Sequence, residues 1–310
     1  MKIHNNKLVS VLINCRNSER YIKEALDSVI SQTYSNFEII LIDNQSTDQT
    51  KNIVKSYNDS RIKYFETKKH LSLGAARNLG LEFSKGKYIA FLDSDDFWEK
   101  TKLQKVLGTF ENSIGIVYSD VNYFNKNKSF KLYSARNPYS GDCFNSLLND
   151  YNLCMSSCVV SIEILNSHHI KFNQSLKVCE DLDFFIQIAY VSKVSYINEV
   201  LVNYRIHGEN LTTKLPELFF HETKIIIQDL VDDKKINSRK ANYLLDQNIL
   251  NQVKFYWKNN EKGKAYSALL KTKYLFFKAI LYGIVITFPY KLINLLYRPF
   301  KSVKIDFYET

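Results

Sequence analysis

The sequence predicts an α/β fold in which a doubly wound sheet is flanked by helices. Short apolar runs of β type alternate with amphipathic segments between residues 9 and 93, and such alternation is typical of parallel sheets with helical crossovers. Three of the apolar runs end in polar clusters, NCRN, IDNQSTD and LDSDD. With 310 residues, 45% of them apolar, the chain can form one large or two unequal domains.

The strands expected in the first part are continuous apolar runs of the buried kind. They cover residues 9–15, 37–43, 62–66 and 87–93. The helices expected between them cover residues 19–32, 46–57 and 72–84. Ser18 is placed to cap the first helix. In a sheet of this kind ligands bind at the carboxyl ends of the strands, so the three polar clusters are expected to meet along one edge.

From residue 114 to 205 the pattern is mixed. Strands are expected at 114–124, 157–161 and 194–207, with a helix at 181–191. Beyond residue 215 the sequence predicts helices throughout. We therefore expect an α/β domain over residues 1–213 and a smaller helical region over 214–310.

The positive charge is concentrated in the C-terminal region, and the cysteine content and the motifs restrict the kinds of protein to consider. The net charge is +10, but residues 254–310 hold eleven Lys/Arg against three Asp/Glu, an excess of +8 that leaves +2 for the first 253 residues. The five cysteines are scattered without Cys-x-x-Cys spacing, which indicates reduced thiols in a cytosolic protein. The first ten residues have no apolar run, so a signal peptide is not expected. No Gly-x-Gly-x-x-Gly follows the first strand, which argues against a dehydrogenase.

The segment YIAFLDSDDFWEK, residues 88–100, ends an apolar strand in Asp93, Asp95 and Asp96. Carboxylates this close repel one another unless a positive charge lies between them. A loop whose carboxylates cap the following helix is one explanation. An Asp-x-Asp pair at the binding edge of the sheet can instead hold a hard divalent cation, which prefers oxygen ligands and bridges to substrate phosphates.

Taken together, these segments resemble the inverting nucleotide-sugar glycosyltransferases of family 2, which have the GT-A fold. The resemblance covers residues 8–210 through SVLINCRN, IILIDNQSTD, GAARNLGLEFSKGKYIAFLDSDD, CEDLDFF and YRIHGEN, in that order. It implies a GT-A type, Rossmann-like mixed sheet flanked by helices, followed by the C-terminal helical region. It also implies a nucleotide-sugar half at 1–120 and an acceptor half at 121–213.

The resemblance implies a role for each matching residue. A Mn²⁺ or Mg²⁺ ion is expected on Asp95, with Asp93 and His207 completing the ligands. Residues expected at the donor are Asn14, Arg16, Asp43, Asn44, Arg77, Asn78, Asp93 and Ser94. Asp96, Glu180 and Arg205 are expected to support these residues without contacting the donor or the cation themselves. Family members often have Asp where this chain has Asn44, and an amide can pair with uracil or with thymine.

Asp181 is the catalytic base that the resemblance implies. A sugar hydroxyl is a poor nucleophile, and a positioned base accelerates its reaction about 10²- to 10⁴-fold. Acids at a helix N-terminus also have a purely structural explanation, which covers Glu180 and Asp181 as well. Asp183 is expected to be structural. His207 can alternatively be an exposed loop histidine, and Arg205 can contact phosphate or form a salt bridge.

The C-terminal region is basic, aromatic and apolar. Its longest run without a charge, residues 279–290, has twelve residues, too few to span a bilayer. Pro289 is expected to end or kink the helix. Lys271, Lys273, Lys278, Lys291, Arg298 and Lys301 flank the apolar residues. This mix suits an in-plane helix on anionic headgroups; the alternative is a hairpin packed on the first domain or on a second copy in a homo-oligomer. Nucleic acid is not an expected partner, because aliphatic residues separate the cations.

The sequence therefore predicts an inverting, metal-dependent transferase that moves a sugar, with a UDP-sugar as the first choice of donor, to a hydroxyl of a glycan or lipid-linked acceptor. Bacterial surface polysaccharide synthesis at the cytoplasmic face of the cell membrane is the expected setting. The alternative is a degenerate, non-catalytic domain that binds nucleotide or glycan as a scaffold. The presence of both Asp-x-Asp and Glu-Asp argues against that alternative.

Overall fold

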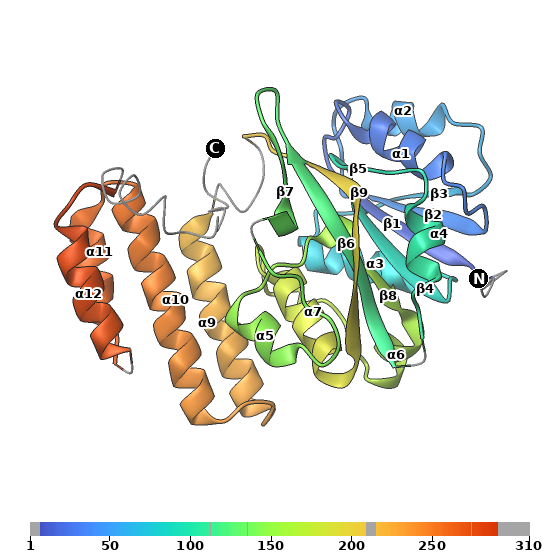
Figure 1. Ribbon diagram of the computed structural model, residues 1–310. Coiled ribbons are helices and arrows are strands. Elements are labelled where there is room, and N and C mark those ends of the chain that lie inside the picture. The colour runs from blue at the N-terminus through green and yellow to red at the C-terminus, as the bar shows by residue number, and fades with distance from the viewer. Residues whose placement is uncertain (1–6, 112, 135, 209–214, 274, 291–310) are drawn as a thin grey trace. The chain divides into compact units, whose positions relative to one another are not determined.

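The structure is a computed structural model that describes residues 7–111, 113–134, 136–208, 215–273 and 275–290. The chain divides into two compact units, Met1–His207 and Gly208–Glu309. The boundary expected between residues 213 and 214 falls outside the described residues. Each unit is described on its own below (Figure 1).

The first unit is built on one mixed sheet with the strand order β3-β2-β1-β4-β8-β6-β9-β5, and β7 pairs with β6. The strands are β1 Val9–Cys15, β2 Phe37–Asp43, β3 Ile62–Glu66, β4 Tyr88–Asp93, β5 Phe97–Trp98, β6 Ile114–Phe124, β7 Ser129–Lys131, β8 Val159–Ser161 and β9 Lys193–Arg205. The pairs β3–β2, β2–β1, β1–β4 and β6–β9 are parallel, whereas β8 runs antiparallel to β4 and β6. The sheet is therefore mixed, as the sequence predicts.

Helices flank this sheet. They are α1 Ile22–Ile30, α2 Thr50–Lys55, α3 Leu73–Phe83, α4 Lys102–Leu107, α5 Phe144–Asn149, α6 Ile162–Ser167 and α7 Glu180–Val191. Two short 3₁₀ turns, η1 Leu132–Ser134 and η2 Met155–Ser157, lie between α4 and β8 in the chain. The helices expected over 72–84 and 181–191 are confirmed as α3 and α7. The short elements β5, β7, α4, α5 and α6 were not expected from the sequence, because each is too short to show a period.

Two of the expected helix starts are wrong. α1 begins at Ile22 and has no side-chain cap, since the Ser18 hydroxyl instead lies 2.8 Å from the Ser94 hydroxyl. α2 begins at Thr50 rather than near residue 46. Asp48 and Glu19 accept hydrogen bonds from backbone amides of this segment. These contacts hold residues 46–49 in a loop.

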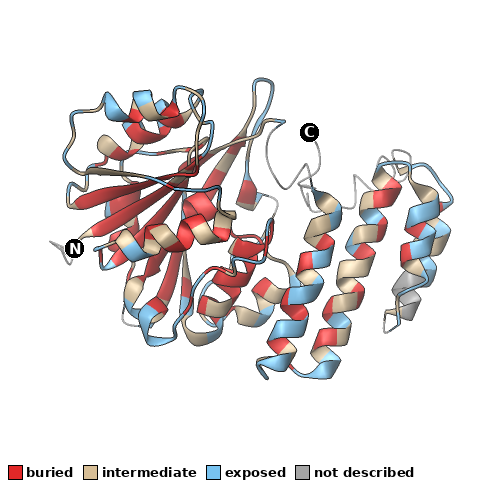
Figure 2. Cartoon of the chain, turned by 180° about the vertical axis from the view of Figure 1, so that it is seen from behind, coloured by how far each residue is buried: buried red, intermediate tan, exposed pale blue. Residues whose placement is uncertain are grey.

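The core lies along the strands of the sheet, and Figure 2 shows the buried residues following them. Every residue of β2 is buried, as expected for a parallel strand that is covered on both faces. On α1 the buried residues are Ile22, Ala25, Leu26 and Val29, which form one side of the helix. The apolar periodicity of the first 93 residues thus specifies the buried sheet from which the loops after the strands extend.

The second unit is helical, with α9 Pro216–Asp232, α10 Ser238–Lys258, α11 Lys262–Leu269 and α12 Phe276–Ile286. A small core gathers around Val253, Tyr256 and Trp257 of α10 with Ile286 of α12. α12 ends three residues before Pro289, which agrees with the effect expected of that proline. No described helix combines the length and apolar character that crossing a bilayer requires. Lys291, Arg298 and Lys301 lie outside the described residues.

Candidate active site at the carboxyl edge of the sheet

The strands β1, β2 and β4 end at one edge of the sheet. Asn14 of β1 is in register with Asp93 of β4, and Cys15 with Asp43 of β2. Because all three strands are parallel, the polar clusters that follow them come together at this edge, as the sequence predicts. The loop after β4 lies at the centre of the group.

That loop is held by a serine from a distant part of the chain. The Asp93 backbone amide donates to Ser156 Oγ over 3.1 Å, and Ser156 Oγ donates to Asp96 Oδ2 over 2.6 Å. The Arg205 amide donates to Asp96 Oδ1 over 2.9 Å. Burial first, and then the charges of Asp95 and Asp93, raise the pKa of the Asp96 carboxyl well above its usual value. Asp96 is therefore part of the support of the loop and not a group facing substrate.

Asp95 faces the end of β9. His207 Nε2 lies 2.7 Å from Asp95 Oδ2, and the His207 ring stacks on Tyr21 with centroids 5.5 Å apart. Tyr21 directly precedes α1. The aspartate and the histidine, 112 positions apart in the chain, thus form a pair with a fixed ring orientation.

Arg205 ties three elements together. Its Nε donates to the Asp95 carbonyl over 3.0 Å, and its Nη2 pairs with the Glu24 carboxylate. The guanidinium also lies 4.5 Å from the centre of the Tyr21 ring. Of the two roles considered for Arg205, the salt bridge is the one that forms here.

Asp95 and His207 are the side chains best placed for a divalent cation. A carboxylate oxygen and an imidazole nitrogen suit Mn²⁺, and such ions commonly take one or two protein ligands with substrate phosphates completing the shell. Asp93, the third expected ligand, accepts from Arg77 through Oδ1. Within the described ranges no group of three His, Cys, Asp or Glu side chains is arranged to hold a metal. The two-residue pair fits a cation that is shared with a diphosphate.

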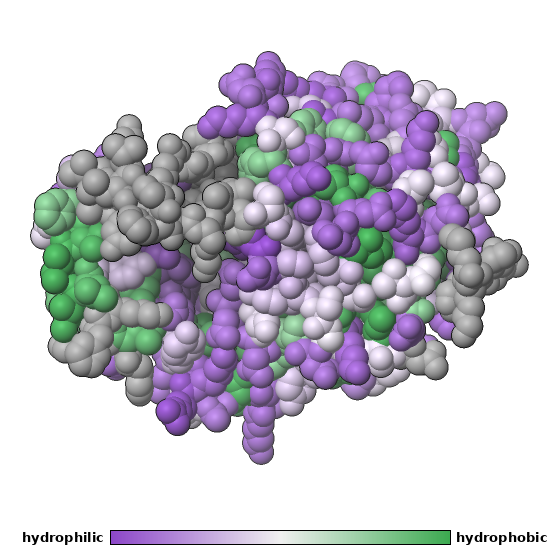
Figure 3. All heavy atoms as spheres, in the orientation of Figure 1, coloured by the Kyte–Doolittle hydropathy of each residue, from purple (hydrophilic) through white to green (hydrophobic). Residues whose placement is uncertain are grey.

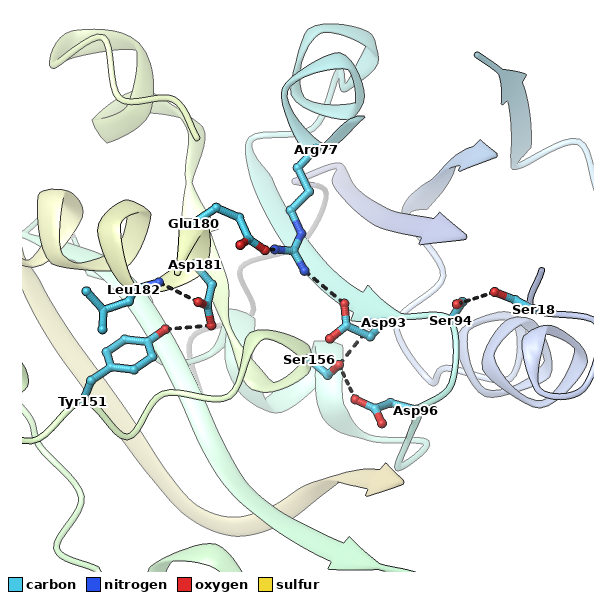
Figure 4. Close-up of polar contacts among 10 residues, drawn as sticks. All are labelled: Ser18, Arg77, Asp93, Ser94, Asp96, Tyr151, Ser156, Glu180, Asp181 and Leu182. Atoms are coloured by element: carbon cyan, nitrogen blue, oxygen red, sulfur yellow. Dashed lines mark hydrogen bonds and ion pairs between the residues drawn. The ribbon is translucent and has the colours of Figure 1, made fainter. Parts of the chain in front are cut away.

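Arg77 joins two carboxylates that lie far apart in the sequence. Its Nη1 donates to Glu180 Oε1 over 2.5 Å and its Nη2 to Asp93 Oδ1 over 3.2 Å (Figure 4). The Arg77 side chain is 6% exposed. Burial alone would lower the pKa of its guanidinium, but Glu180 and Asp93 outweigh that effect and raise it. The guanidinium therefore bridges the loop after β4 and the start of α7.

Asp181 lies in the first turn of α7, next to this bridge (Figure 4). Its Oδ1 accepts from the Leu182 amide over 2.7 Å, and its Oδ2 accepts from the Tyr151 hydroxyl over 3.2 Å. Burial first, and then the neighbouring Glu180 charge, raise the pKa of Asp181 to about 7. A carboxyl with such a pKa can take up a proton near neutral pH. Asp183 is buried and accepts from Gln187, so its expected structural role fits.

The side chains of two expected donor residues, Asn44 and Asn78, hydrogen-bond to backbone within the domain. Both ends of the Asn44 amide engage the backbone of Leu71, at 2.9 Å each. Both ends of the Asn78 amide engage the backbone of Phe172, also at 2.9 Å. An amide that closes two backbone bonds has its best donor and acceptor occupied. Asn44 and Asn78 therefore position backbone segments of the domain.

Asp43 is also engaged by the protein. Its carboxylate accepts from the Ser46 amide and from the Tyr64 hydroxyl. The Asn14 side-chain nitrogen, by contrast, is buried and has no hydrogen-bond partner among the described residues. Arg16 is exposed, with its guanidinium 3.4 Å from His70 Nε2. Of the predicted donor residues, Arg16 is thus exposed, and Asn14 has a side-chain nitrogen that no described residue engages.

Sequence reasoning missed Tyr21, Tyr151 and Ser156. Each contacts a predicted site residue. Tyr21 stacks on His207, Tyr151 hydrogen-bonds to Asp181, and Ser156 hydrogen-bonds to the Asp93–Asp96 loop. Tyr151 and Ser156 lie in a stretch without periodic apolar residues, and no motif surrounds them. The sequence contained no signal that would have found them.

Two groups of carboxylates, Asp93 with Asp95 and Glu180 with Asp181, thus lie at the carboxyl edge of a mixed α/β sheet and are joined by Arg77, and the comparisons with known proteins give the class of protein. The family model described as glycosyl transferase family 2 matches residues 10–165. An uncharacterized glycosyltransferase of Rickettsia typhi is 30% identical over 85% of this chain and 84% of its own length. A UDP-Glc:alpha-D-GlcNAc-diphosphoundecaprenol beta-1,3-glucosyltransferase of Escherichia coli, WfgD, is 28% identical over 82% and 98%, respectively. The crystal structure of S. aureus TarS 1-349 in complex with UDP-GlcNAc superposes with a TM-score of 0.66 at 21% identity, covering 84% of this chain and 79% of that one.

The chain belongs to glycosyltransferase family 2. It is a glycosyltransferase with the GT-A fold.

Proposed function

We propose that this enzyme transfers a sugar, with inversion, from a UDP-sugar to a hydroxyl of a lipid-linked glycan. Asp181 is the general base in this proposal, and a divalent cation, Mn²⁺ or Mg²⁺, binds at Asp95 and His207. The first half of the GT-A domain, residues 1–120, takes the donor, and the half over 121–213 takes the acceptor. A degenerate scaffold is the competing possibility.

The observation that carries the proposal is the double contact of Arg77. One guanidinium reaches both Glu180, next to the proposed base, and Asp93, two residues before the proposed cation ligand Asp95. It therefore keeps the base and the diphosphate site in one place although they are far apart in the chain. Single displacement needs this arrangement, because the attacking and leaving oxygens lie on opposite sides of the sugar carbon.

In the proposed reaction the acceptor oxygen attacks the anomeric carbon of the donor while Asp181 Oδ2 or Oδ1 takes the hydroxyl proton. The bond between the anomeric carbon and the diphosphate oxygen breaks, and UDP leaves with that electron pair. A pKa of about 7 leaves much of Asp181 ionised at neutral pH yet basic enough to accept a proton. Tyr151 holds the carboxylate in place, with its own hydroxyl protonated because burial and Asp181 raise the pKa of the phenol.

A bound divalent cation would neutralise the negative charge that develops on the leaving diphosphate. In this chain Asp95 and His207 would hold it, and Arg205 and Ser156 keep their loop in position. Asn14 and Arg16 are proposed to contact the nucleoside.

The relatives support the choice of substrates. WfgD is named for UDP-glucose and for a diphosphoundecaprenol-linked acceptor, and the TarS structure contains UDP-GlcNAc. An acceptor on a polyprenyl diphosphate lies in a membrane. We therefore place the enzyme at the cytoplasmic face of the cell membrane in surface polysaccharide synthesis, in contact with the bilayer through its C-terminal region.

The first experiment compares the wild type with Asp181→Asn. Thermal stability is measured with UDP, TDP, GDP and CDP, with and without Mn²⁺, and transfer is measured from UDP-glucose and UDP-GlcNAc to a diphosphoundecaprenol-linked sugar. We expect UDP to stabilise both proteins only with the metal, by about 2.7 kcal/mol at a hundredfold excess over Kd. Transfer by Asp181→Asn should fall about 10²- to 10⁴-fold.

Asp142→Asn is the matched control, because Asp142 is exposed and lies in the same half of the domain. It should leave both readouts unchanged. A wild type that binds UDP but transfers no sugar to any tested acceptor would favour the scaffold. Full transfer by Asp181→Asn would remove Asp181 from the role of base.

A further inference from the structure

The second unit exposes several large apolar side chains near its C-terminal helices. Among the side chains that the structure describes in α12 and its two flanks, the exposed large aliphatic and phenylalanine ones are Leu270, Ile280, Leu281, Ile284 and Phe288; this set is called the α12 face below. Leu270 is 88% exposed, Leu281 62% and Ile284 58%. In Figure 3 apolar side chains gather over α11 and α12, at the left of the view.

The α12 face is the outer side of a helix that is already anchored on its inner side. Tyr282, Val285 and Ile286 pack around the Trp257 core. Trp257 Nε1 donates to the Phe288 carbonyl over 2.9 Å. Ile280, Leu281 and Ile284 therefore form a second apolar side of α12, and Leu270 at the end of α11 and Phe288 after α12 add to it.

α11 and α12 run antiparallel. Lys262, at the start of α11, donates to the Thr287 carbonyl just past the end of α12, and the Tyr266 hydroxyl contacts the Gly283 carbonyl. Leu270, four residues beyond Tyr266, therefore lies toward the start of α12. The exposed apolar residues thus belong to one antiparallel pair of helices.

Cations surround this face. Residues 262–290 contain five lysines, 262, 264, 271, 273 and 278, and no Asp or Glu. Lys271 and Lys273 are exposed beside Leu270, and Lys262 lies at the opposite end through its bond to Thr287. An apolar strip with cations at both ends matches a surface of acyl chains beneath anionic headgroups.

We propose that the α12 face docks on an anionic lipid bilayer, with α12 lying in the plane of the headgroups. The proposal deepens the proposed function, on which it rests for its setting, by naming the surface and the lipid charge. A second copy of the chain is the less suitable occupant. A symmetric pair would bring the lysines of one copy close to those of the other, and residues 262–290 hold no acid to offset them. Glu261 already pairs with Lys264 of its own chain, and like charges across an interface oppose association.

The test is co-flotation of the full-length protein with vesicles of phosphatidylglycerol and phosphatidylcholine, against phosphatidylcholine alone, without donor or acceptor. We expect binding that grows with the anionic fraction and falls with salt. Leu281→Glu/Ile284→Glu should weaken it more than about tenfold, since each apolar side chain loses its burial. Lys271→Glu/Lys273→Glu should weaken binding to anionic vesicles about 25-fold or more, at about fivefold per cation.

Ile225→Glu and Lys224→Glu are the matched controls, because both residues are exposed on α9, outside the α12 face; both variants should bind as the wild type does. Absence of wild-type binding, or binding that the α12 variants leave intact, overturns the proposal. So does a stable dimer that Leu281→Glu/Ile284→Glu converts to monomer. Metal-dependent UDP binding, measured on the same samples, separates these outcomes from failure of the proposed function, because it does not require vesicles.

Discussion

The Tyr151 hydroxyl donates a hydrogen bond to Asp181 Oδ2 over 3.2 Å, from a residue thirty positions earlier in the chain. Tyr151 follows α5 directly after Asp150, and its carbonyl accepts from Arg136. The hydrogen bond opposes the effects that raise the pKa of Asp181, which are its burial and the charge of Glu180. Arg136 thus contacts the backbone of Tyr151, and the Tyr151 hydroxyl in turn lowers the pKa of Asp181, the proposed base.

The wild-type enzyme should lose activity as the pH falls below 7. Asp181 must be ionised to accept the hydroxyl proton, and its pKa is raised to about 7. Below that pH its ionised fraction, and with it kcat/KM, should fall about tenfold per pH unit. A profile of kcat/KM from pH 5 to 9 with saturating metal checks this expectation. A flat profile down to pH 5 would mean that Asp181 does not act as a base with this pKa.

Tyr151→Phe should move the acid side of that profile upward. The hydrogen bond stabilises the ionised carboxylate, so its loss should raise the pKa of Asp181 by about one unit. kcat/KM should then be about tenfold lower than in the wild type below pH 7 and approach the wild-type value above pH 9.

Tyr133→Phe is the control for this change, because Tyr133 donates to the Asn152 carbonyl of the same region and not to Asp181. Its profile should keep the wild-type midpoint. A uniform loss of activity at every pH in Tyr151→Phe would assign Tyr151 to packing alone.

The alternation of strands and helices up to residue 93 was sufficient to predict the sheet, its binding edge and the meeting of the three polar clusters. Apolar periodicity reports directly on burial, and parallel strands align their ends. The hydrogen-bond partner of each polar side chain could not be predicted in the same way. The amides of Asn44 and Asn78 could in principle bind a nucleotide. In the structure they instead donate to the backbone carbonyls of Leu71 and Phe172, respectively. Which backbone lies opposite an amide depends on loops that have no period.

Ser156→Ala should lower the affinity for UDP in the presence of Mn²⁺. The Ser156 hydroxyl bonds to the Asp93 amide and to the Asp96 carboxylate, so its loss leaves two buried polar groups unpaired at a cost of about 1–3 kcal/mol each. The loop that carries Asp95 then loses its fixed position, and Mn²⁺-dependent UDP affinity should fall about 10- to 100-fold. Titration with UDP at fixed Mn²⁺ measures the change.

Ser157→Ala is the neighbouring control, since the Ser157 hydroxyl donates to the Cys154 carbonyl and does not touch the aspartate loop. It should lower stability but keep the affinity for UDP with Mn²⁺. Equal affinities in the two variants would show that Ser156 does not position the site.

Lys102→Met should change how stability depends on pH. Lys102 is fully buried, donates to the Ser157 carbonyl over 2.8 Å and lies 5.0 Å from the Trp98 ring. Burial lowers the pKa of its ammonium group to about 7, whereas an unfolded lysine has a pKa of about 10.4. Between these values the unfolded chain binds a proton that the folded chain lacks. The contribution of Lys102 to the free energy of unfolding therefore rises with pH, by up to about 1.4 kcal/mol per unit.

Methionine removes that dependence. Lys102→Met should be more stable than the wild type at pH 6, where the wild type must bury a charged amine. Its advantage should shrink as the pH rises and reverse near pH 10, because the Ser157 carbonyl is then left without the amine that it accepts from. Urea unfolding at pH 6, 8 and 10, taken as the difference between variant and wild type, measures this. Lys100→Met, at an exposed position two residues away, should give a difference that does not change with pH. A pH-independent difference for Lys102→Met would mean that Lys102 keeps its proton in the folded protein, and the turn Met155–Ser157 would then be held by a buried charge.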